Sequence, residues 1–152
     1  HPADFTPVST TELGEVARRS KDFEERNVKV LGLSANSLGD HEKWVEDINE
    51  VNGVHLNFPI IADAERQVAA LYDMLDHQDV TNVDTKGRNF DEIIRVIDSL
   101  QLGDKHRCTT PANWKKGEDV IVHPSVSNEE ANTLFPGYRT IKPYLRLAKS
   151  PF

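Results

Sequence analysis

Apolar residues recur at helical spacing in four segments of the first hundred residues. The four faces comprise Leu13, Val16, Ala17 and Phe23; Trp44, Val45, Ile48 and Val51; Val68, Leu71, Tyr72 and Leu75; and Phe90, Ile93, Ile94, Ile97 and Leu100. Spacings of three and four residues are typical of one face of an α-helix. Ser9 and Glu12 have the form of a capping box for the first helix, which Asn27 ends. Asn52-Gly53 closes the second helix, and Asp63 is placed to cap the third.

Two segments between these helices predict β-strands. The first is the apolar run 28–33, and the second is 58–61, where Pro59 favours a strand start or an edge. Strands alternating with helices favour an α/β layer fold. Two strands, however, make too small a sheet to bury four helix faces. Either the helices bundle together, or strands are missing from this sequence.

The pattern changes from Thr109 onward. Prolines recur, and short β-like pieces such as 120–122 replace long helical stripes. Ser127 and Glu130 have the form of a second capping box, which predicts a short helix to about Phe135. We therefore expect two parts, a core at 1–108 and a small, loop-rich C-terminal module at 109–152. Between the third and fourth helices, 76–87 has charges and turn formers but few apolar residues, which predicts a connection.

Composition narrows the function classes. The chain has 18 basic and 25 acidic residues, a formal net charge of −7, so it is a poor candidate for nonspecific nucleic-acid binding. No apolar run approaches the ~18–20 residues that span a bilayer. The single cysteine, Cys108, excludes an internal disulfide and favours a reducing compartment, so we expect a cytoplasmic location. The six histidines show no ligand spacing such as His-x-x-x-His, so neither a metal nor a cofactor is expected.

The opening residues carry a more specific signal. His1-Pro2-Ala3-Asp4-Phe5-Thr6-Pro7-Val8-Ser9-Thr10-Thr11-Glu12 resembles the active-site loop of the peroxiredoxins, whose motif is Pro-x-x-x-Thr-x-x-Cys. Pro2 and Thr6 fit this motif, and Ser9 stands where the cysteine would be. The resemblance continues through 58–61, 87–92 and 110–114, and it covers nearly the whole chain. The last stretch and the module after it resemble the one-cysteine subgroup.

The resemblance implies a thioredoxin-like α/β fold, in which strand 28–33 would be central or nearly so, with helices on both faces. Peroxiredoxins have a further N-terminal stretch with a core strand, and two more core strands near the position of Lys86-Gly87-Arg88. Their absence here would explain the shortage of strands, and it suggests that the sequence joins pieces of a longer chain near 86–88. One absent strand would bring an arginine that contacts the catalytic sulfur.

The resemblance also assigns roles to site residues. Ser9 takes the place of the nucleophile, Thr6 would hydrogen-bond the nucleophile and the peroxide, and Pro2 would shield the site from water. Arg88 matches a second active-site arginine, and Glu12 would support the arginine network. His1 is a further candidate, although no carboxylate partner can be assigned to it from the sequence.

The expected activity is thiol-dependent reduction of hydrogen peroxide and organic hydroperoxides. Its partners would be the peroxide, an external thiol reductant and a second copy of the chain in a homodimer or a higher oligomer. Because a serine hydroxyl cannot form a sulfenic acid, we expect this chain to lack turnover. Whether Ser9 is engineered or marks a natural inactive paralogue stays open. Two alternatives also stay open: a non-enzymatic holdase or redox-signalling partner, and a phospholipid hydrolase whose serine would lie in an upstream segment.

Overall fold

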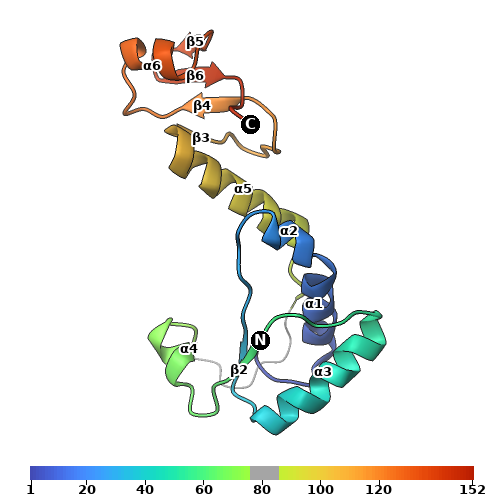
Figure 1. Ribbon diagram of the computed structural model, residues 1–152. Coiled ribbons are helices and arrows are strands. Elements are labelled where there is room, and N and C mark those ends of the chain that lie inside the picture. The colour runs from blue at the N-terminus through green and yellow to red at the C-terminus, as the bar shows by residue number, and fades with distance from the viewer. Residues whose placement is uncertain (76–85) are drawn as a thin grey trace. The chain divides into compact units, whose positions relative to one another are not determined.

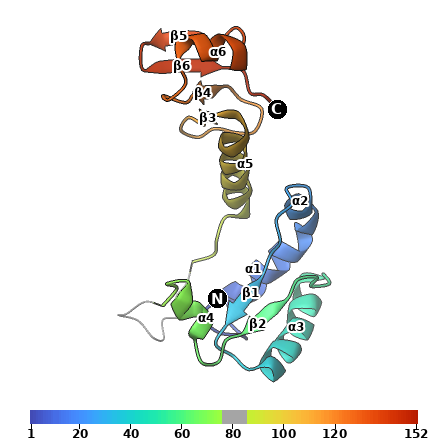
Figure 2. The same cartoon turned by 60° about the vertical axis from the view of Figure 1, so that its left-hand side comes forward.

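The computed structural model describes residues 1–75 and 86–152, so most of the connection expected at 76–87 lies outside the described residues. The chain forms two compact units, His1–Phe90 and Asp91–Phe152 (Figures 1 and 2). This division falls before the boundary expected at residue 108. The difference arises because Leu102, near the end of the long helix, belongs to the core of the second unit.

The first unit combines helices with a small parallel sheet. Its elements are α1 (Pro7–Arg18), α2 (Ser20–Glu24), β1 (Gly32–Ser34), α3 (Leu38–Asn52), β2 (Ile60–Ala62) and α4 (Gln67–Leu71). α3 packs on α1 and on β2, as Figures 1 and 2 show. Between α1 and α3, Leu13, Trp44 and Ile48 form the buried apolar cluster.

Strand β1 is shorter than the predicted 28–33 and is not central in the described part of the chain. It pairs in parallel with β2, with Gly32 opposite Ile60 and Ser34 opposite Ala62. Because the described residues of this unit supply no third strand, residues 28–31 stay unpaired, and Leu31 is 62% exposed. The shortage of strands inferred from the pattern is therefore present in the structure.

The first helix begins earlier than the capping-box pattern predicts. Thr6 is its N-cap and Pro7 its first residue, so the capping box at Ser9 and Glu12 is wrong. Proline suits the first helical position because its φ is already helical and its missing N–H would have no partner there. Ser9 consequently lies inside the first turn, and the helix ends at Arg18 before the short α2 follows.

The C-terminal end of α3 follows the prediction, whereas α4 is shorter than predicted and ends at Leu71. Gly53 caps α3 in the left-handed conformation (φ 62°), which glycine adopts without steric cost. The N-cap residue of α4 is Arg66 and not the predicted Asp63, although the Asp63 carboxylate accepts hydrogen bonds from the backbone N–H groups of Val68 (3.1 Å) and Ala69 (2.8 Å) in the first turn. The apolar face expected on α4 is not buried, since Leu71 is 81% exposed.

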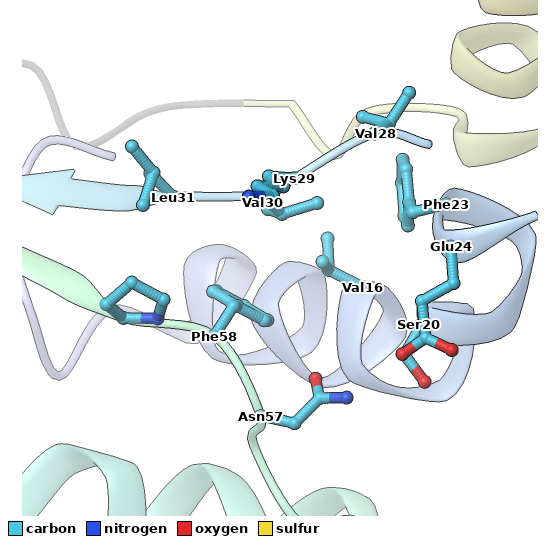
Figure 3. Close-up of a pocket in the computed structure, with 11 residues that line it drawn as sticks. Val16, Ser20, Phe23, Glu24, Val28, Lys29, Val30, Leu31, Asn57 and Phe58 are labelled. Carbon is cyan, nitrogen blue, oxygen red and sulfur yellow. The ribbon is translucent and has the colours of Figure 1, made fainter. Parts of the chain in front are cut away.

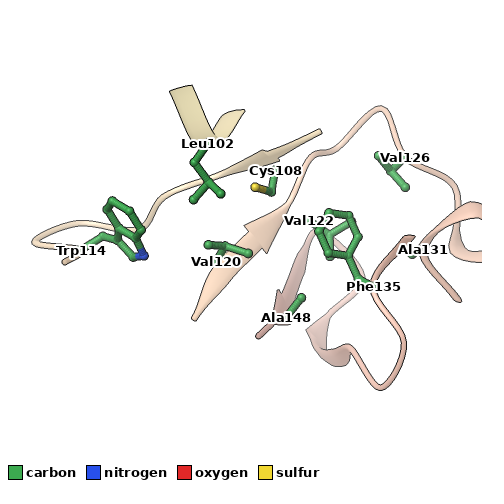
Figure 4. Close-up of a cluster of buried hydrophobic side chains, with 9 residues drawn as sticks. All are labelled: Leu102, Cys108, Trp114, Val120, Val122, Val126, Ala131, Phe135 and Ala148. Atoms are coloured by element: carbon green, nitrogen blue, oxygen red, sulfur yellow. The ribbon is translucent and has the colours of Figure 1, made fainter. Parts of the chain in front are cut away.

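The second unit has an antiparallel sheet and its own core. Its elements are α5 (Phe90–His106), β3 (Cys108–Thr109), β4 (Val120–Val122), α6 (Asn128–Leu134), β5 (Arg139–Lys142) and β6 (Leu145–Ala148). The strands lie in the order β3-β4-β6-β5. Nine buried residues form the core shown in Figure 4, including Trp114 and Phe135. The predicted capping box of α6 is confirmed in both directions between Ser127 and Glu130.

The predicted helix at 90–100 is also confirmed, as α5. Of its residues, only Asp98 and Leu102 are buried. Leu100, which belongs to the strong apolar stripe, is 64% exposed. The stripe thus predicted the element correctly but not the burial of its apolar face.

Candidate active site at the start of helix α1

Ser9 occupies the first turn of α1 and is 1% exposed. The N–H groups of a helix's first turn have no partner within the helix, and together with the helix dipole they favour a negative charge. The Thr6 side chain makes no capping hydrogen bond to these groups. An anionic group at position 9 would therefore be stabilised by the helix start.

Thr6 and Pro2 frame the approach to this turn. The Thr6 hydroxyl donates a hydrogen bond to the carbonyl oxygen of Ala3 (2.9 Å), and its backbone carbonyl accepts from Thr10. No hydrogen bond joins the hydroxyls of Ser9 and Thr6 in the described structure, so Thr6 instead fixes the loop before the helix. Pro2 is exposed. The roles proposed for both residues towards a peroxide stay predictions.

Arg88 and Glu12 form the ion pair of the site. The Arg88 guanidinium lies 2.6 Å from Glu12 Oε2. The backbone N–H of Arg88 also donates a hydrogen bond to Glu12 Oε1 (2.9 Å). The Glu12 side chain is almost fully buried, whereas that of Arg88 is 60% exposed. Ser9 and Glu12 are three residues apart, so they lie on the same face of α1. Glu12 therefore holds a positive charge on the side of the helix that carries Ser9.

Asp4 is the site residue that the sequence pattern did not reveal. Its fully buried carboxylate lies 2.9 Å from His1 Nε2, and it accepts a hydrogen bond from the Ser34 hydroxyl (2.8 Å). It also contacts His41 Nδ1. The partner that could not be assigned to His1 is thus three residues away. A His-x-x-Asp spacing in a loop gives no geometric signal, unlike the same spacing in a helix.

The loop between Asp4 and the helix has an unusual backbone. Phe5 adopts φ 58°, in the left-handed region, where a bulky residue is rare. Such a conformation costs about 1–3 kcal/mol and persists only when the surroundings hold it. The flanking residues hold Phe5 in this conformation: the Asp4 backbone N–H donates to Asn36 Oδ1 (3.0 Å), and the Thr6 hydroxyl donates to the Ala3 carbonyl oxygen (2.9 Å).

Trp44 supports the site from α3. Its indole N–H donates to the Thr10 hydroxyl (3.0 Å), which in turn donates to the Thr6 carbonyl (2.7 Å). The His1 ring packs on Trp44 with 4.8 Å between ring centroids. The first turn of α1 and the His1 ring are therefore both fixed against the same buried side chain.

Charge also connects these residues. Burial lowers the pKa of the His1 α-amino group, and the positive charge of Arg88 lowers it further, whereas Glu12 and Asp4 oppose the shift. Asp4, Glu12 and Arg88 thus all lie close enough to the His1 amino group to affect its pKa. The structure brings His1, Glu12 and Arg88 together with Ser9 near the start of α1, as the motif suggested, and it adds Asp4.

A pocket of about 320 Å³ lies elsewhere in the first unit (Figure 3). In Figure 3, Val16 and Phe23 of the helices face Val28 and Val30 of the unpaired segment. Ser9 is not among the residues that line it. The pocket therefore lies apart from position 9, and residues 28–31 form part of its lining.

Cys108 lies in the second unit and is buried. Burial raises the pKa of its thiol, which opposes formation of the reactive thiolate. The described residues contain no group of three or more His, Cys, Asp or Glu side chains that could hold a metal ion. Within the same described ranges, no helix is both long and apolar enough to cross a membrane.

Comparison with known families identifies the chain. Residues 1–95 match the AhpC/TSA family. The chain belongs to this family. Residues 99–137 match the C-terminal domain of 1-Cys peroxiredoxin. The two matches confirm the resemblance to one-cysteine peroxiredoxins stated above, and with it the general role of a thiol peroxidase.

Individual relatives agree with this assignment. A 1-Cys peroxiredoxin of Dictyostelium discoideum is 45% identical over 174 residues, covering 99% of this chain and 72% of the relative. The mitochondrial peroxiredoxin PRX1 of Saccharomyces cerevisiae is 44% identical, covering 99% and 68%. The solved structure of a yeast mitochondrial 1-Cys peroxiredoxin matches with a TM-score of 0.91 at 44% identity, covering 99% of this chain and 84% of that one.

A second solved structure has the same degree of likeness. It is a cysteine-to-serine mutant of the peroxiredoxin 6 of Arenicola marina, with a TM-score of 0.91 and 40% identity, covering 99% and 83%. The thioredoxin-like peroxiredoxin fold predicted from the sequence is therefore confirmed.

The comparison with the Dictyostelium relative also bears on the missing strands. Its 174 aligned residues exceed the 152 of this chain by 22, so at least 22 residues of the relative have no counterpart here. This excess agrees with the shortage of strands in the first unit. The junction expected near 86–88 stays a prediction.

Proposed function

We propose that this chain carries the peroxidatic site of a thiol peroxidase for hydrogen peroxide and organic hydroperoxides, with Ser9 in place of the nucleophilic cysteine. The observation that carries the proposal is the position of Ser9. It lies in the uncapped first turn of α1, on the helix face where Glu12 holds Arg88. Membership of the AhpC/TSA family supports the same activity.

The chemistry explains why the helix start matters. A thiolate sulfur attacks one peroxide oxygen, the S–O bond forms as the O–O bond breaks, and the other oxygen leaves as hydroxide or alkoxide. Negative charge is present throughout, first on sulfur and then on the leaving oxygen. The first-turn N–H groups and a nearby guanidinium stabilise such charge. A proton then converts the leaving oxygen to water or alcohol.

Serine at position 9 prevents this reaction. Its hydroxyl stays protonated at neutral pH and forms no sulfenic acid. Acting as a nucleophile, it would need a base within hydrogen-bond reach. In the described structure, His1 directs Nε2 to Asp4 and makes no hydrogen bond to Ser9. We therefore infer that the chain as it stands keeps the site's arrangement and lacks turnover.

An external thiol is the proposed reductant. A sulfenic acid at position 9 would need a second thiol, and Cys108 is the only other candidate position in the sequence. Its burial and raised pKa make it unsuitable as a resolving cysteine. Assembly as a homodimer, or a higher oligomer, stays a prediction. It is favoured by exposed apolar side chains in the second unit, such as Ile141 and Tyr144.

The decisive experiment restores the thiol. Ser9→Cys should consume hydrogen peroxide with dithiothreitol as reductant, whereas the parent chain, which has only the buried Cys108, should not. Ser20→Cys in α2 is the matched control, because it adds a partly exposed thiol to the same unit at a position outside the first turn of α1. Equal peroxide consumption by the parent, or by the Ser20→Cys control, would contradict the proposal.

A further inference from the structure

Asp4 connects three separate parts of the first unit through one carboxylate. Oδ1 accepts from the Ser34 hydroxyl at the end of β1 (2.8 Å) and lies 2.9 Å from His1 Nε2. Oδ2 contacts Nδ1 of His41, which belongs to the first turns of α3. The Asp4 side chain has no exposed surface. A buried carboxylate with three donors around it is a strongly specified arrangement, because each partner offsets its loss of water.

The partners of His41 determine the protons on its ring. Nε2 lies 3.1 Å from the Ile61 carbonyl oxygen, which can only accept, so Nε2 carries a hydrogen. Nδ1 faces Asp4 Oδ2, and without a proton between them two lone pairs would oppose each other. The Asp4–His41 pair therefore has one proton more than an ionised carboxylate beside a neutral ring. Its net charge is zero, which suits a buried site.

The same carboxylate orients His1. Because Asp4 Oδ1 accepts, His1 Nε2 is the donor, and in the neutral ring Nδ1 keeps its lone pair. The ring packs on Trp44 at an interplanar angle of 43°, and the His1 backbone nitrogen donates to the Leu33 carbonyl (3.0 Å). Asp4 thus selects the tautomer of His1, while Trp44 and β1 fix the position of the ring.

We infer that Asp4 is a positioning residue for the site at Ser9. Through Oδ1 it holds His1 in one tautomer, with Nδ1 free, and through the proton shared with His41 it anchors the loop that leads into Thr6 and α1. The inference deepens the proposed function, on which its catalytic part rests. Its structural part concerns the chain as it stands.

Histidine-ring NMR tests the structural part without any activity. Long-range ¹H–¹⁵N correlation spectra should show Nε2 protonated in both His1 and His41, and Nδ1 of His1 unprotonated. Asp4→Asn should change both patterns, because an amide has one acceptor oxygen where the carboxylate has two. The matched control is Asp63→Asn, since that buried carboxylate accepts only backbone N–H groups of α4, and it should leave both rings unchanged. A His41 ring unprotonated at Nε2, or a His1 ring that interconverts between tautomers in the parent, would overturn the inference.

The catalytic part is tested in the Ser9→Cys background. Asp4→Asn should slow oxidation of the introduced thiol by hydrogen peroxide about tenfold or more, because the His1 ring loses the partner that fixes its orientation beside the site. Asp63→Asn should stay close to the background rate. In a His1→Gln background the effect of Asp4→Asn should become smaller, because the part that acts through His1 is lost while the contact with His41 remains. The positioning role would be overturned if Asp4→Asn and Asp63→Asn slowed thiol oxidation equally. It would also be overturned if Asp4→Asn slowed oxidation as much in the His1→Gln background as in the Ser9→Cys background. If Ser9→Cys itself has no activity, the proposed function fails, and the ring spectra still decide the inference.

Discussion

Cys108 has a chemistry set by its surroundings. It is 2% exposed and packs in the core of the second unit beside Leu102 and Val122 (Figure 4). Burial raises the pKa of the thiol, because a thiolate would lose its water there without gaining a cationic partner. A cysteine in this environment behaves as a small apolar residue and not as a redox centre.

This burial predicts both slow alkylation and a pH effect. Iodoacetamide should modify Cys108 about tenfold or more slowly in the folded chain than in urea, because only the thiolate reacts. The unfolded thiol ionises at about pH 8.5, while the folded thiol still holds its proton. The thiol's contribution to stability is therefore complete below that pH and is lost as the pH rises through the folded pKa. Urea unfolding at pH 7 and at pH 10 measures this loss of stability, and the Cys108→Ala variant, which has no thiol, is the control. The prediction is contradicted if the parent chain loses no more stability between pH 7 and pH 10 than the Cys108→Ala variant does.

Single residues also show what the sequence could predict of the site. The spacing of Pro2, Thr6 and Ser9 predicts a site at the start of α1, which stays a prediction, and Arg88 and Glu12 do form an ion pair there. Asp4 escaped prediction because its role depends on folding. Its partners Ser34 and His41 are 30 and 37 residues away in the sequence. Its contact with His1 depends on a loop in which Phe5 has a positive φ.

At the scale of elements, the same four-residue signature occurs twice with different outcomes. Ser127-x-x-Glu130 is a true capping box, in which each side chain accepts from the other residue's backbone N–H (3.1 and 2.8 Å). Ser9-x-x-Glu12 is not, because Pro7 starts α1 two residues earlier and Glu12 binds Arg88 instead. The signature describes local bonding only, so a proline before it and a long-range partner after it can change its meaning.

The capping box of α6 yields a prediction for this helix. Ser127→Ala should destabilise the second unit by about 1 kcal/mol, because the Glu130 N–H loses its acceptor in a short helix of seven residues. Thr133→Ala in the same helix is the matched control, and it should be neutral or slightly stabilising, since alanine is the better helix former. Urea unfolding of the parent and both variants gives the comparison. A Ser127→Ala chain as stable as the parent would show that the box contributes nothing.

At the scale of the whole molecule, the apolar pattern predicted elements better than it predicted burial. The long helices at the positions of α3 and α5 were expected and are present. Their apolar faces are only partly covered, as the exposure of Val51 (69%) and Leu100 (64%) shows. The spacing of apolar residues in one segment determines a helix, whereas burial of the apolar face of that helix requires other elements to pack on it. The described residues of the first unit form two strands, which agrees with the residues that the Dictyostelium relative has and this chain lacks.

The two units differ in their cores, and this difference predicts how the chain unfolds. The second unit buries a cluster of nine residues, whereas the α1–α3 cluster of the first unit contains three. Because apolar burial is the main source of stability, the first unit should unfold at a lower urea concentration than the second. Two separate transitions would then replace a single cooperative one.

Each unit has one of the chain's two tryptophans, so the two transitions can be followed separately. Trp44 is buried in the first unit and Trp114 in the second. In a chain labelled with 5-fluorotryptophan, two ¹⁹F resonances should respond to urea, and Trp44→Phe assigns them by removing one. The Trp44 resonance should reach its unfolded position first, while Trp114 still reports a native core. Ser127→Ala should shift only the Trp114 transition, because the capping box lies in the second unit. Coincident transitions for the two resonances, with a common midpoint and slope, would show instead that the small core of the first unit does not unfold on its own.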